Sequence, residues 1–502
     1  MDQDDKILCS SSNASPNISP NHRLESQGWT WILSLCGIST TLGASVAVGY
    51  NIGVVNTPAH IIQNWCNESF LISYGMNLNE AQMDILWSTI VSIFLIGGML
   101  GSLAGSWIAD RFGRKGGIKI SYFLSILSGL MFLACKPLSS IILLFMARFI
   151  IGLASGLIMA VIPMYLVEIA PTALRGAMGV LCPLGVTFGV LLGQFMGLKW
   201  LLGKETTWHY LLGLYLCLTI PCSVVLPLLP ESPKYLSAVI GNNHKAAKEL
   251  ARLRGLTVEE VSHELEQSRP ITEVDTWNLS KLLRSKHLYL PLALVCSLQA
   301  GQQFSGINAV CYYSMKIFES AGLSVEGSQY ASLGAGVVNF GVAALMIPIV
   351  NNCKRRILLL ISCSSTVITL LLITVSITFI DTASWVPYFS IASVLIYVFV
   401  YGLGLGPIPY FIGSELFDVG PRVSGMALGS VANWTGNFVI GMTFPTMQRI
   451  IGQYSFIFFA TNTAFLTIFL KYYLPETFVK VNKNVELGKY ETVPIKNTND
   501  DL

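Results

Sequence analysis

Long apolar runs separated by short polar stretches dominate the chain from residue 29 onward. A membrane-crossing helix needs about 20 mostly apolar residues, and these runs reach or approach that length. The first half holds Trp29–Val55, Ile85–Ala109, Ile118–Ala134, Ile141–Leu166, Gly176–Leu198 and Tyr210–Leu229. The second half holds Leu288–Ser314, Ala331–Val350, Ile357–Ile380, Val386–Gly413, Val423–Met447 and Tyr454–Tyr473. Because lipid cannot satisfy an open backbone, we predict twelve transmembrane helices in an all-α integral membrane protein.

Charged motifs at the ends of these runs recur once in each half of the chain. Glu168 is followed seven residues later by Arg175, and the same spacing returns 247 residues further on at Glu415 and Arg422. A basic stretch at 110–115 and the Pro-Glu-Ser of 230–232 also return, at 351–356 and 475–477. This internal repeat predicts two similar membrane bundles with a pathway between them.

The basic residues orient the predicted spans. An even number of spans places both termini on one side, and the side rich in lysine and arginine is the cytosol. The long first external segment, residues 56–83, then carries no lysine or arginine. The basic residues that do fall outside are Lys136, Lys199, Lys204, Lys316 and Arg449.

This topology divides the chain into five parts. They are a cytosolic tail (1–28), a six-helix bundle (29–229), a cytosolic linker (230–287), a second six-helix bundle (288–475) and a cytosolic tail (476–502). The linker contains amphipathic stretches at 244–254 and 258–268, which predict short helices that cap the bundles.

Composition excludes several classes of function. Charged residues make up 12% of the chain, against about 25% in soluble proteins. No phosphate-binding loop is present, so we expect no nucleotide requirement and no enzyme activity. The eleven cysteines show no metal-ligand or disulfide spacing, and only Cys66 falls within an external segment. We therefore expect no cofactor, metal or nucleic-acid partner, and we expect glycosylation at Asn67, the one sequon predicted to lie outside.

Seven short motifs occur in order along the chain. They are Gly-Tyr-Asn (49–51), Asp-Arg-Phe-Gly-Arg-Lys (110–115), Pro-Glu-Ser-Pro (230–233), Gln-Gln-Phe-Ser-Gly-Ile-Asn (302–308), Gly-Pro-Ile-Pro (406–409), Asn-Trp-Thr (433–435) and Pro-Glu-Thr (475–477). Together they resemble the animal facilitative hexose transporters, in the sugar-porter branch of the major facilitator superfamily. The resemblance implies two pseudo-symmetric bundles, alternating access in the plasma membrane, and a sugar site near the bilayer midplane.

A sugar offers neutral hydroxyls, so its site needs amides rather than charges. The candidates in the apolar runs are Gln302, Gln303, Asn308, Asn339 and Asn433. For the two isolated asparagines, a structural hydrogen bond between helices is an equal alternative. The resemblance implies that all five are sugar ligands, and it adds Trp434 and Tyr410 as aromatic faces for the sugar ring.

Charged residues lie where the spans meet the cytosol. They are Arg111, Arg114, Glu168, Arg175, Glu231, Glu415, Arg422 and Glu476. We predict that pairs between the two halves latch the inner gate while the site faces outward and break on inward opening. The alternative is that these charges only determine topology.

Arg148 is the one strong cation inside a predicted span, where a charge costs at least about 2.5–3.5 kcal/mol. It needs partners, and the resemblance implies Asn51 as its neighbour. Proton-coupled relatives carry an aspartate at that position, whereas an asparagine cannot titrate. We therefore predict a hexose uniporter, with D-glucose as the first expectation. A fructose or broad-hexose carrier, a proton-coupled symporter and a non-transporting sensor are the alternatives.

Several departures from the family pattern bear on the substrate. Pro183 stands where the family has a glutamine in the fifth span, Gly402 replaces a glutamate, and Tyr410 replaces a tryptophan. Gln299-Ala300-Gly301 stands where glucose-selective members have Gln-Leu-Ser. Pro183 is expected to remove a sugar ligand and to kink its span. These positions leave the choice of hexose open.

Overall fold

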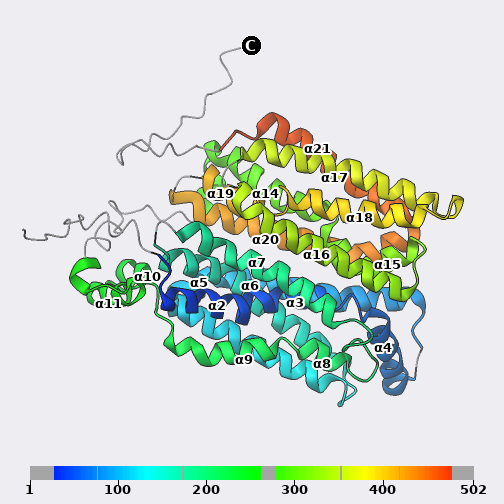
Figure 1. Cartoon of the computed structure of the whole chain (residues 1–502), viewed down its shortest axis with the longest axis horizontal. Coiled ribbons are helices and arrows are strands. Elements are labelled where there is room, and N and C mark those ends of the chain that lie inside the picture. The colour runs from blue at the N-terminus through cyan, green and yellow to red at the C-terminus, as the bar shows by residue number, and fades with distance from the viewer. Residues whose placement is uncertain are drawn as a thin grey trace, which may run out of the picture.

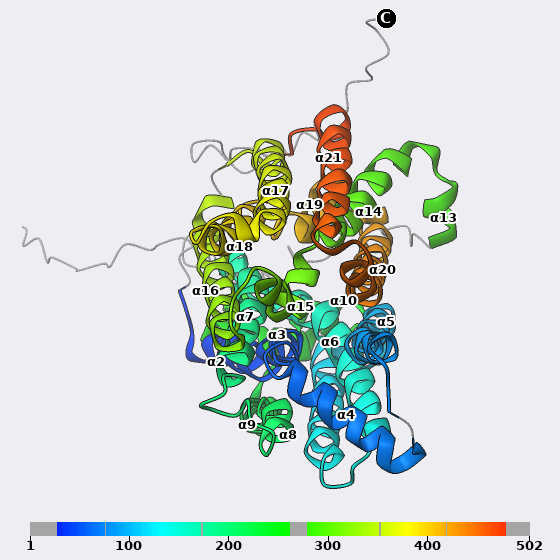
Figure 2. The ribbon, with the colours of Figure 1, turned by 90° about the vertical axis from the view of Figure 1, so that its right-hand side faces the viewer.

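The structure is a computed structural model that describes residues 28–75, 77–171, 174–261, 279–350, 353–417 and 419–477. The helices of the two halves of the chain form two groups that lie side by side with their axes roughly parallel (Figure 1). Viewed along the helices, the two groups face each other across the middle of the molecule (Figure 2). Most of the two predicted tails, and most of the predicted helix at 258–268, lie outside the described residues.

The N-terminal group contains every predicted span of the first half. Its helices are α2 (Trp31–Thr40) and α3 (Val46–Gly53), joined by a π-helical turn, then α5 (Glu80–Cys135), α6 (Ile141–Ile169), α7 (Arg175–Met196), α8 (Trp208–Gly213) and α9 (Leu216–Val225). The 56-residue α5 covers two predicted spans and changes direction at Gly113, whose φ of 82° and ψ of 169° are not helical.

The C-terminal group repeats this plan with two broken spans. Its helices are α14 (Tyr289–Phe304), α15 (Ile307–Ser320), α16 (Val325–Val350), α17 (Arg355–Thr378), α18 (Val386–Gly402), α19 (Pro409–Leu416), α20 (Val419–Ile451) and α21 (Ser455–Tyr473). The predicted span 288–314 is divided between α14 and α15, and the span 386–413 between α18 and α19.

The described residues contain eight helical segments that are long and apolar enough to cross a membrane. Two of them, with 56 and 50 residues, have the length of two crossings of about 20 residues each. The broken pair α14–α15 and the apolar α18 account for the remaining spans. The helices therefore agree with the twelve predicted crossings.

One helix at the end of the molecule was not predicted. α4 (Ala59–Tyr74) follows α3, and its Trp65 packs against Trp208 with ring centroids 5.0 Å apart. Cys66 lies on this helix and is fully buried, and burial raises the pKa of its thiol to about 12. Asn67 accepts a hydrogen bond from the Leu78 backbone N–H at 3.0 Å, and its glycosylation stays a prediction.

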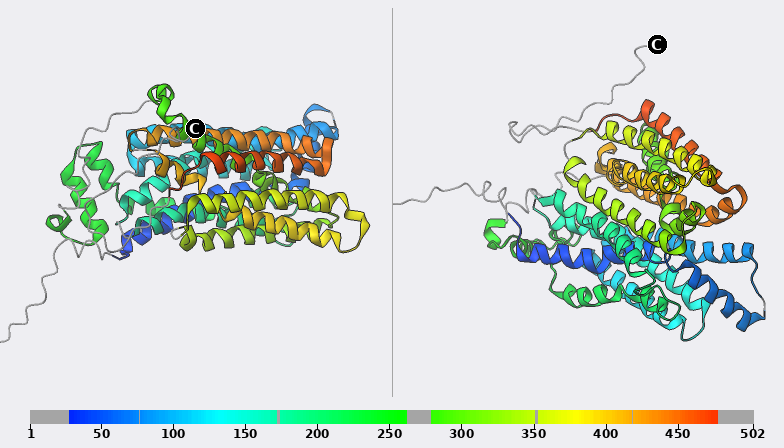
Figure 3. Two further views of the ribbon diagram at one scale, coloured as in Figure 1. Left: turned by 90° about the horizontal axis from the view of Figure 1, so that it is seen from above. Right: turned by 45° about the vertical axis from the view of Figure 1, so that its right-hand side comes forward.

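The linker helices lie at the opposite end of the molecule from α4 (Figure 3). They are α10 (Pro233–Ala238), α11 (Asn243–Arg254) and α13 (Leu279–Arg284). The predicted amphipathic helix at 244–254 is present as α11, and Arg254 at its end donates to the Ile169 carbonyl at 2.8 Å. α11 therefore docks on the N-terminal group. The two ends of the molecule are called the α4 end and the linker end below.

Candidate functional site

The two groups meet along two helix pairs, α5 against α20 and α7 against α16. Small residues allow close approach at this interface, since a side chain at Gly98 of α5 would collide with the Trp434 ring of α20. The Trp434 indole N–H also donates to the Ser102 hydroxyl at 2.8 Å. Trp434 thus contacts the opposite half directly.

A break between α14 and α15 places three predicted amides together. Gly306 has a φ of 89°, and a side chain there would collide with Phe459, so the break requires glycine. The Tyr397 hydroxyl donates to the Ser305 carbonyl at 2.9 Å and satisfies a backbone group that the break frees. Gln302 and Gln303 consequently end α14, and Asn308 begins α15.

These amides form one hydrogen-bonded group with Asn433 of α20. The Asn433 amide donates to Gln302 Oε1 at 2.8 Å, and the Gln302 amide donates to the Leu405 and Gly406 carbonyls at 3.0 and 2.7 Å. Gln303 donates to Gln302, and Asn308 donates to Gln303. The group is neutral and nearly buried, as binding of an uncharged polyol requires.

Gln299 belongs to the same group and was not among the predicted ligands. It accepts from Asn433 at 2.9 Å and donates to the Pro409 carbonyl at 2.9 Å. The sequence carried a signal for it, because Gln299 precedes Gln302 by three residues and shares its helix face.

Of the two remaining predicted ligands, Asn339 lies apart from this group and Tyr410 lies beside it. Asn339 lines a small cavity with Gln194, between α7, α15, α16 and α18. Tyr410 of α19 is 47% exposed, and its hydroxyl interacts with the Asn433 side chain. Their roles as sugar ligands stay predictions.

Arg148 of α6 is fully buried and joins three helices. Its guanidinium donates to the carbonyls of Asn51, Ile90 and Val91 at 2.8, 3.2 and 3.3 Å, and it lies 4.7 Å from the centre of the Phe94 ring. Asn51 is therefore the neighbour of Arg148, but the hydrogen bond between them uses the Asn51 backbone carbonyl and not its side chain. The Asn51 side chain instead donates to the Ala47 carbonyl at 2.9 Å.

The charges at the linker end pair within the N-terminal half. Arg114 binds Glu168 through two contacts of 2.9 Å and Asp110 through one of 3.3 Å. Glu231 accepts from the backbone N–H groups of Arg114 and Lys115, both at 3.1 Å. Burial raises the pKa of Glu231, while these hydrogen bonds oppose the shift.

The C-terminal half repeats the arrangement with different residues. Glu415 binds Arg355 at 3.4 Å, and Glu476 accepts from the Arg355 backbone N–H at 2.8 Å. Arg422 donates to the Phe417 carbonyl at 3.3 and 3.2 Å. Arg355 was not among the predicted pairing residues, although it lies in the basic stretch 351–356.

The glutamate and arginine that recur seven residues apart in each half therefore do not pair with each other in the described residues. Glu168 and Glu415 each bind an arginine of their own half, while the Arg175 Nε atom is buried without a hydrogen-bond partner in the described residues. Arg111 is exposed. Latching between the halves stays a prediction for another conformation.

At the α4 end, polar contacts join the two halves. Asp84 of α5 binds Lys316 of α15 at 3.5 Å and Arg449 of α20 at 3.4 Å, and we call these three residues the Asp84 clasp. His60 of α4 lies 3.2 Å from Glu319 of α15. Lys316 and Arg449 are two of the five lysines and arginines that the predicted topology places outside. The sequence therefore indicated that these two cations lie at the α4 end, but not that they bind Asp84.

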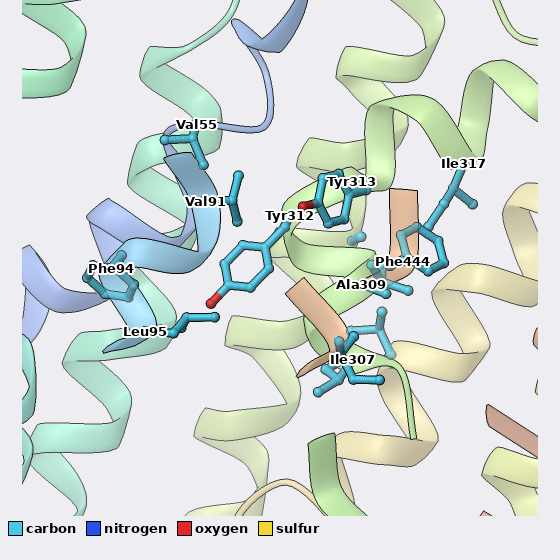
Figure 4. Packing of buried hydrophobic residues seen from close by; sticks show 14 of the residues in the cluster. Val55, Val91, Phe94, Leu95, Ile307, Ala309, Tyr312, Tyr313, Ile317 and Phe444 are labelled. Atoms are coloured by element: carbon cyan, nitrogen blue, oxygen red, sulfur yellow. The ribbon is translucent and has the colours of Figure 1, made fainter. Parts of the chain in front are cut away.

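Further contacts between the halves lie beside the clasp. Asn56 donates to the hydroxyls of Ser314 and Ser332, and its carbonyl oxygen accepts from the Met315 N–H at 3.4 Å. Tyr312 reaches from α15 toward Val91, Phe94 and Leu95 of α5 (Figure 4). The α4 end is therefore closed by an apolar layer beneath polar contacts.

Comparison with known proteins gives a family and a fold. The model of the family described as sugar (and other) transporter matches residues 36–487. The chain is 38% identical to facilitated glucose transporter member 1 of Gallus gallus, over 86% of this chain and 88% of that protein. It is 35% identical to member 5 of Mus musculus, over 92% and 93% of the two chains.

Among solved structures, the chain is similar to the xylose transporter XylE from E. coli in a partially occluded inward open conformation. The TM-score is 0.72 at 22% identity, and the match covers 90% of this chain and 100% of that one. This likeness confirms the predicted major facilitator fold.

Proposed function

Because the chain belongs to the sugar transporter family, we propose that it is a facilitative carrier that moves a hexose, with D-glucose first, down its gradient across the plasma membrane. The linker end faces the cytosol and the α4 end faces outside. This orientation puts both termini in the cytosol, and the basic residues of the linker support it. In this state the protein is closed toward the outside.

The neutral amide group is the observation that supports sugar binding. Without a ligand its members donate hydrogen bonds to one another and to neighbouring backbone carbonyls. A hexose hydroxyl both donates and accepts, and it replaces these bonds one for one. The net gain per exchanged hydrogen bond is modest, about 0.5–1.5 kcal/mol. Weak, reversible binding suits a carrier that must release its substrate.

The surroundings of Arg148 favour uniport over proton symport. Its hydrogen-bond acceptors are backbone carbonyls, and the neighbouring Asn51 side chain does not titrate. Uptake into proteoliposomes should therefore saturate with hexose concentration, and the final level should not follow an imposed proton gradient. Accumulation driven by that gradient would show a proton symporter instead.

The preferred hexose is tested by competition. Pro183, Gly402 and Tyr410 depart from the family pattern, so a fructose or broad-hexose carrier is the alternative. Unlabelled glucose, galactose and fructose should inhibit labelled glucose uptake in proportion to their affinities. We expect unlabelled glucose to inhibit uptake at the lowest concentration of the three sugars. A lower inhibitory concentration for fructose than for glucose would favour the alternative.

Replacing Gln302 should weaken sugar binding more than replacing Asn308. Gln302 bonds to Asn433, Gln303 and two carbonyls, so Gln302→Ala leaves several buried groups unpaired, whereas Asn308 has one such bond. One lost bond is worth about 0.5–1.5 kcal/mol, so the apparent affinity should fall several-fold or more. The measurement is the KM for uptake, corrected for surface expression.

Asn462→Ala provides the matched control. Asn462 is a partly exposed amide on α21 whose one hydrogen bond among the described residues goes to the Phe458 carbonyl of its own helix, at 2.8 Å. Its replacement should leave KM unchanged. An unchanged KM in both Gln302→Ala and Asn308→Ala would remove the α14–α15 break from the sugar site.

Breaking the Asp84 clasp should favour the outward-facing state. Asp84→Asn removes both charge pairs while preserving shape, and each partly exposed pair contributes about 0.2–1 kcal/mol. The population should therefore shift outward by several-fold. An impermeant maleimide applied outside should label a cysteine at Val310 faster in this variant, on a background cleared of other reactive cysteines.

Lys199→Gln is the control for this shift. It breaks another contact between the halves, with Glu326 at 3.3 Å, but both side chains are about two-thirds exposed. Its labelling rate should stay near that of the parent. Equal labelling of Asp84→Asn and the parent would mean that the clasp does not hold the outer end closed.

A further inference from the structure

α7 carries a single amide side chain, Gln194, and that residue meets the C-terminal half. It is 4% exposed and lines the small cavity that also contains Asn339. The remaining lining is mainly apolar. One amide from each half of the molecule therefore faces the same space.

The Gln194 amide is only half satisfied in this state. Its Nε2 donates to the Ser332 hydroxyl at a long 3.4 Å, and its Oε1 is buried without a hydrogen-bond partner in the described residues. A side chain at Gly336 would collide with Oε1, so only glycine lets the amide lie against α16. The described residues also show no hydrogen bond to the Asn339 side chain. An unpaired buried amide is destabilising, and its presence points to a ligand in another state.

Gln194 shares a helix face with the position of the missing family ligand. Pro183 and Gln194 are eleven residues apart, which is about three turns and within about 20° around the helix. α7 continues through Pro183 as one helix, so this relation is preserved. Pro183 is exposed, while Gln194 lies about 16 Å further toward the α4 end.

We propose that Gln194 is a specificity-determining sugar contact that acts together with Asn339, on the external side of the Gln302 group. When the outer end opens, α16 and α7 separate, and Gln194 Oε1 gains a hexose hydroxyl as its donor. The amide at 194 thereby supplies the N-terminal half with the contact that proline cannot make at 183. This inference rests on the proposed hexose transport.

The test uses full-length protein in proteoliposomes and a series of glucose analogues that each lack one hydroxyl. Gln194→Leu removes the amide at similar volume, and its KM for glucose should rise about threefold to tenfold. One deoxy analogue should bind parent and variant equally, because the hydroxyl that it lacks is the partner of Gln194. Ser332→Ala keeps the amide and should stay close to the parent.

A second variant ties the effect to position 194. Pro183→Gln adds an amide on the same face of α7 but about 16 Å away, so Gln194→Leu should raise KM by a similar factor in that background. If Gln194→Leu reaches the membrane poorly, Gln194→Met replaces it as a flexible side chain of equal length without an amide.

The outcomes separate this inference from the proposed function. A parent protein without saturable hexose uptake overturns the proposed function. A parent that transports hexose, with Gln194→Leu and Gln194→Met showing unchanged KM and an unchanged order of analogues, overturns the role of Gln194 alone.

Discussion

Arg148→Leu is expected to unfold at a markedly lower temperature than the parent protein and to lose transport. The guanidinium makes three hydrogen bonds to carbonyls of α3 and α5, and such bonds to a charged group are worth about 1.5–3 kcal/mol each. These bonds offset the cost of a charge within the membrane, which is at least about 2.5–3.5 kcal/mol, and removing the guanidinium takes this donor from three buried carbonyls. Arg148 therefore contributes net stability by holding three helices together.

Arg148→Lys should rescue little of this loss. An ammonium is a single point of charge and cannot reach three carbonyls in the way that a planar guanidinium does. Thermal unfolding of the purified protein in detergent, together with uptake in proteoliposomes, measures both effects. Arg111→Leu, at an exposed position, is the control for thermal unfolding and should match the parent in that measurement. Parental stability in Arg148→Leu would contradict this role.

Glu168→Ala should destabilise the protein much more than Glu415→Ala, although the two residues occupy equivalent places in the repeat. Glu168 holds Arg114 by two contacts of 2.9 Å, and the two side chains are 14% and 10% exposed. Its removal leaves a nearly buried guanidinium with Asp110 as its remaining acidic partner. Loss of one partner of a buried pair costs about 3–5 kcal/mol, and partial exposure reduces this value.

Glu415 provides the internal comparison. Its contact with Arg355 is longer, at 3.4 Å, and its side chain is 26% exposed, so solvent compensates more of the loss. Thermal unfolding and surface expression should be measured for both variants. Glu168→Gln should remain close to Glu168→Ala, because a neutral amide does not balance the guanidinium charge. Equal stability of the Glu168 and Glu415 variants would show that the halves differ less than their contacts indicate.

The membrane crossings and the amide cluster were predictable from the sequence because both depend on local chemistry. A bilayer sets the length and apolar character of each span, independently of its neighbours. Gln302, Gln303 and Asn308 lie close together in the chain, so their proximity needed only one helix and one break. Gln299 could have been predicted by the same reasoning, because it precedes Gln302 by three residues on the same helix.

The partners of the charged residues were decided by the tertiary structure. Glu168 lies 54 residues from Arg114, and seven from Arg175, yet it binds the more distant one. The Asp84 clasp joins α5 to α15 and α20, and the unsatisfied amide of Gln194 exists because α7 packs against Gly336. α4 was missed because its sequence is neither long nor strongly apolar, and it is held by packing against the bundle. Such contacts depend on how two rigid bundles meet, and their geometry changes with conformation, whereas the span pattern along the chain stays the same.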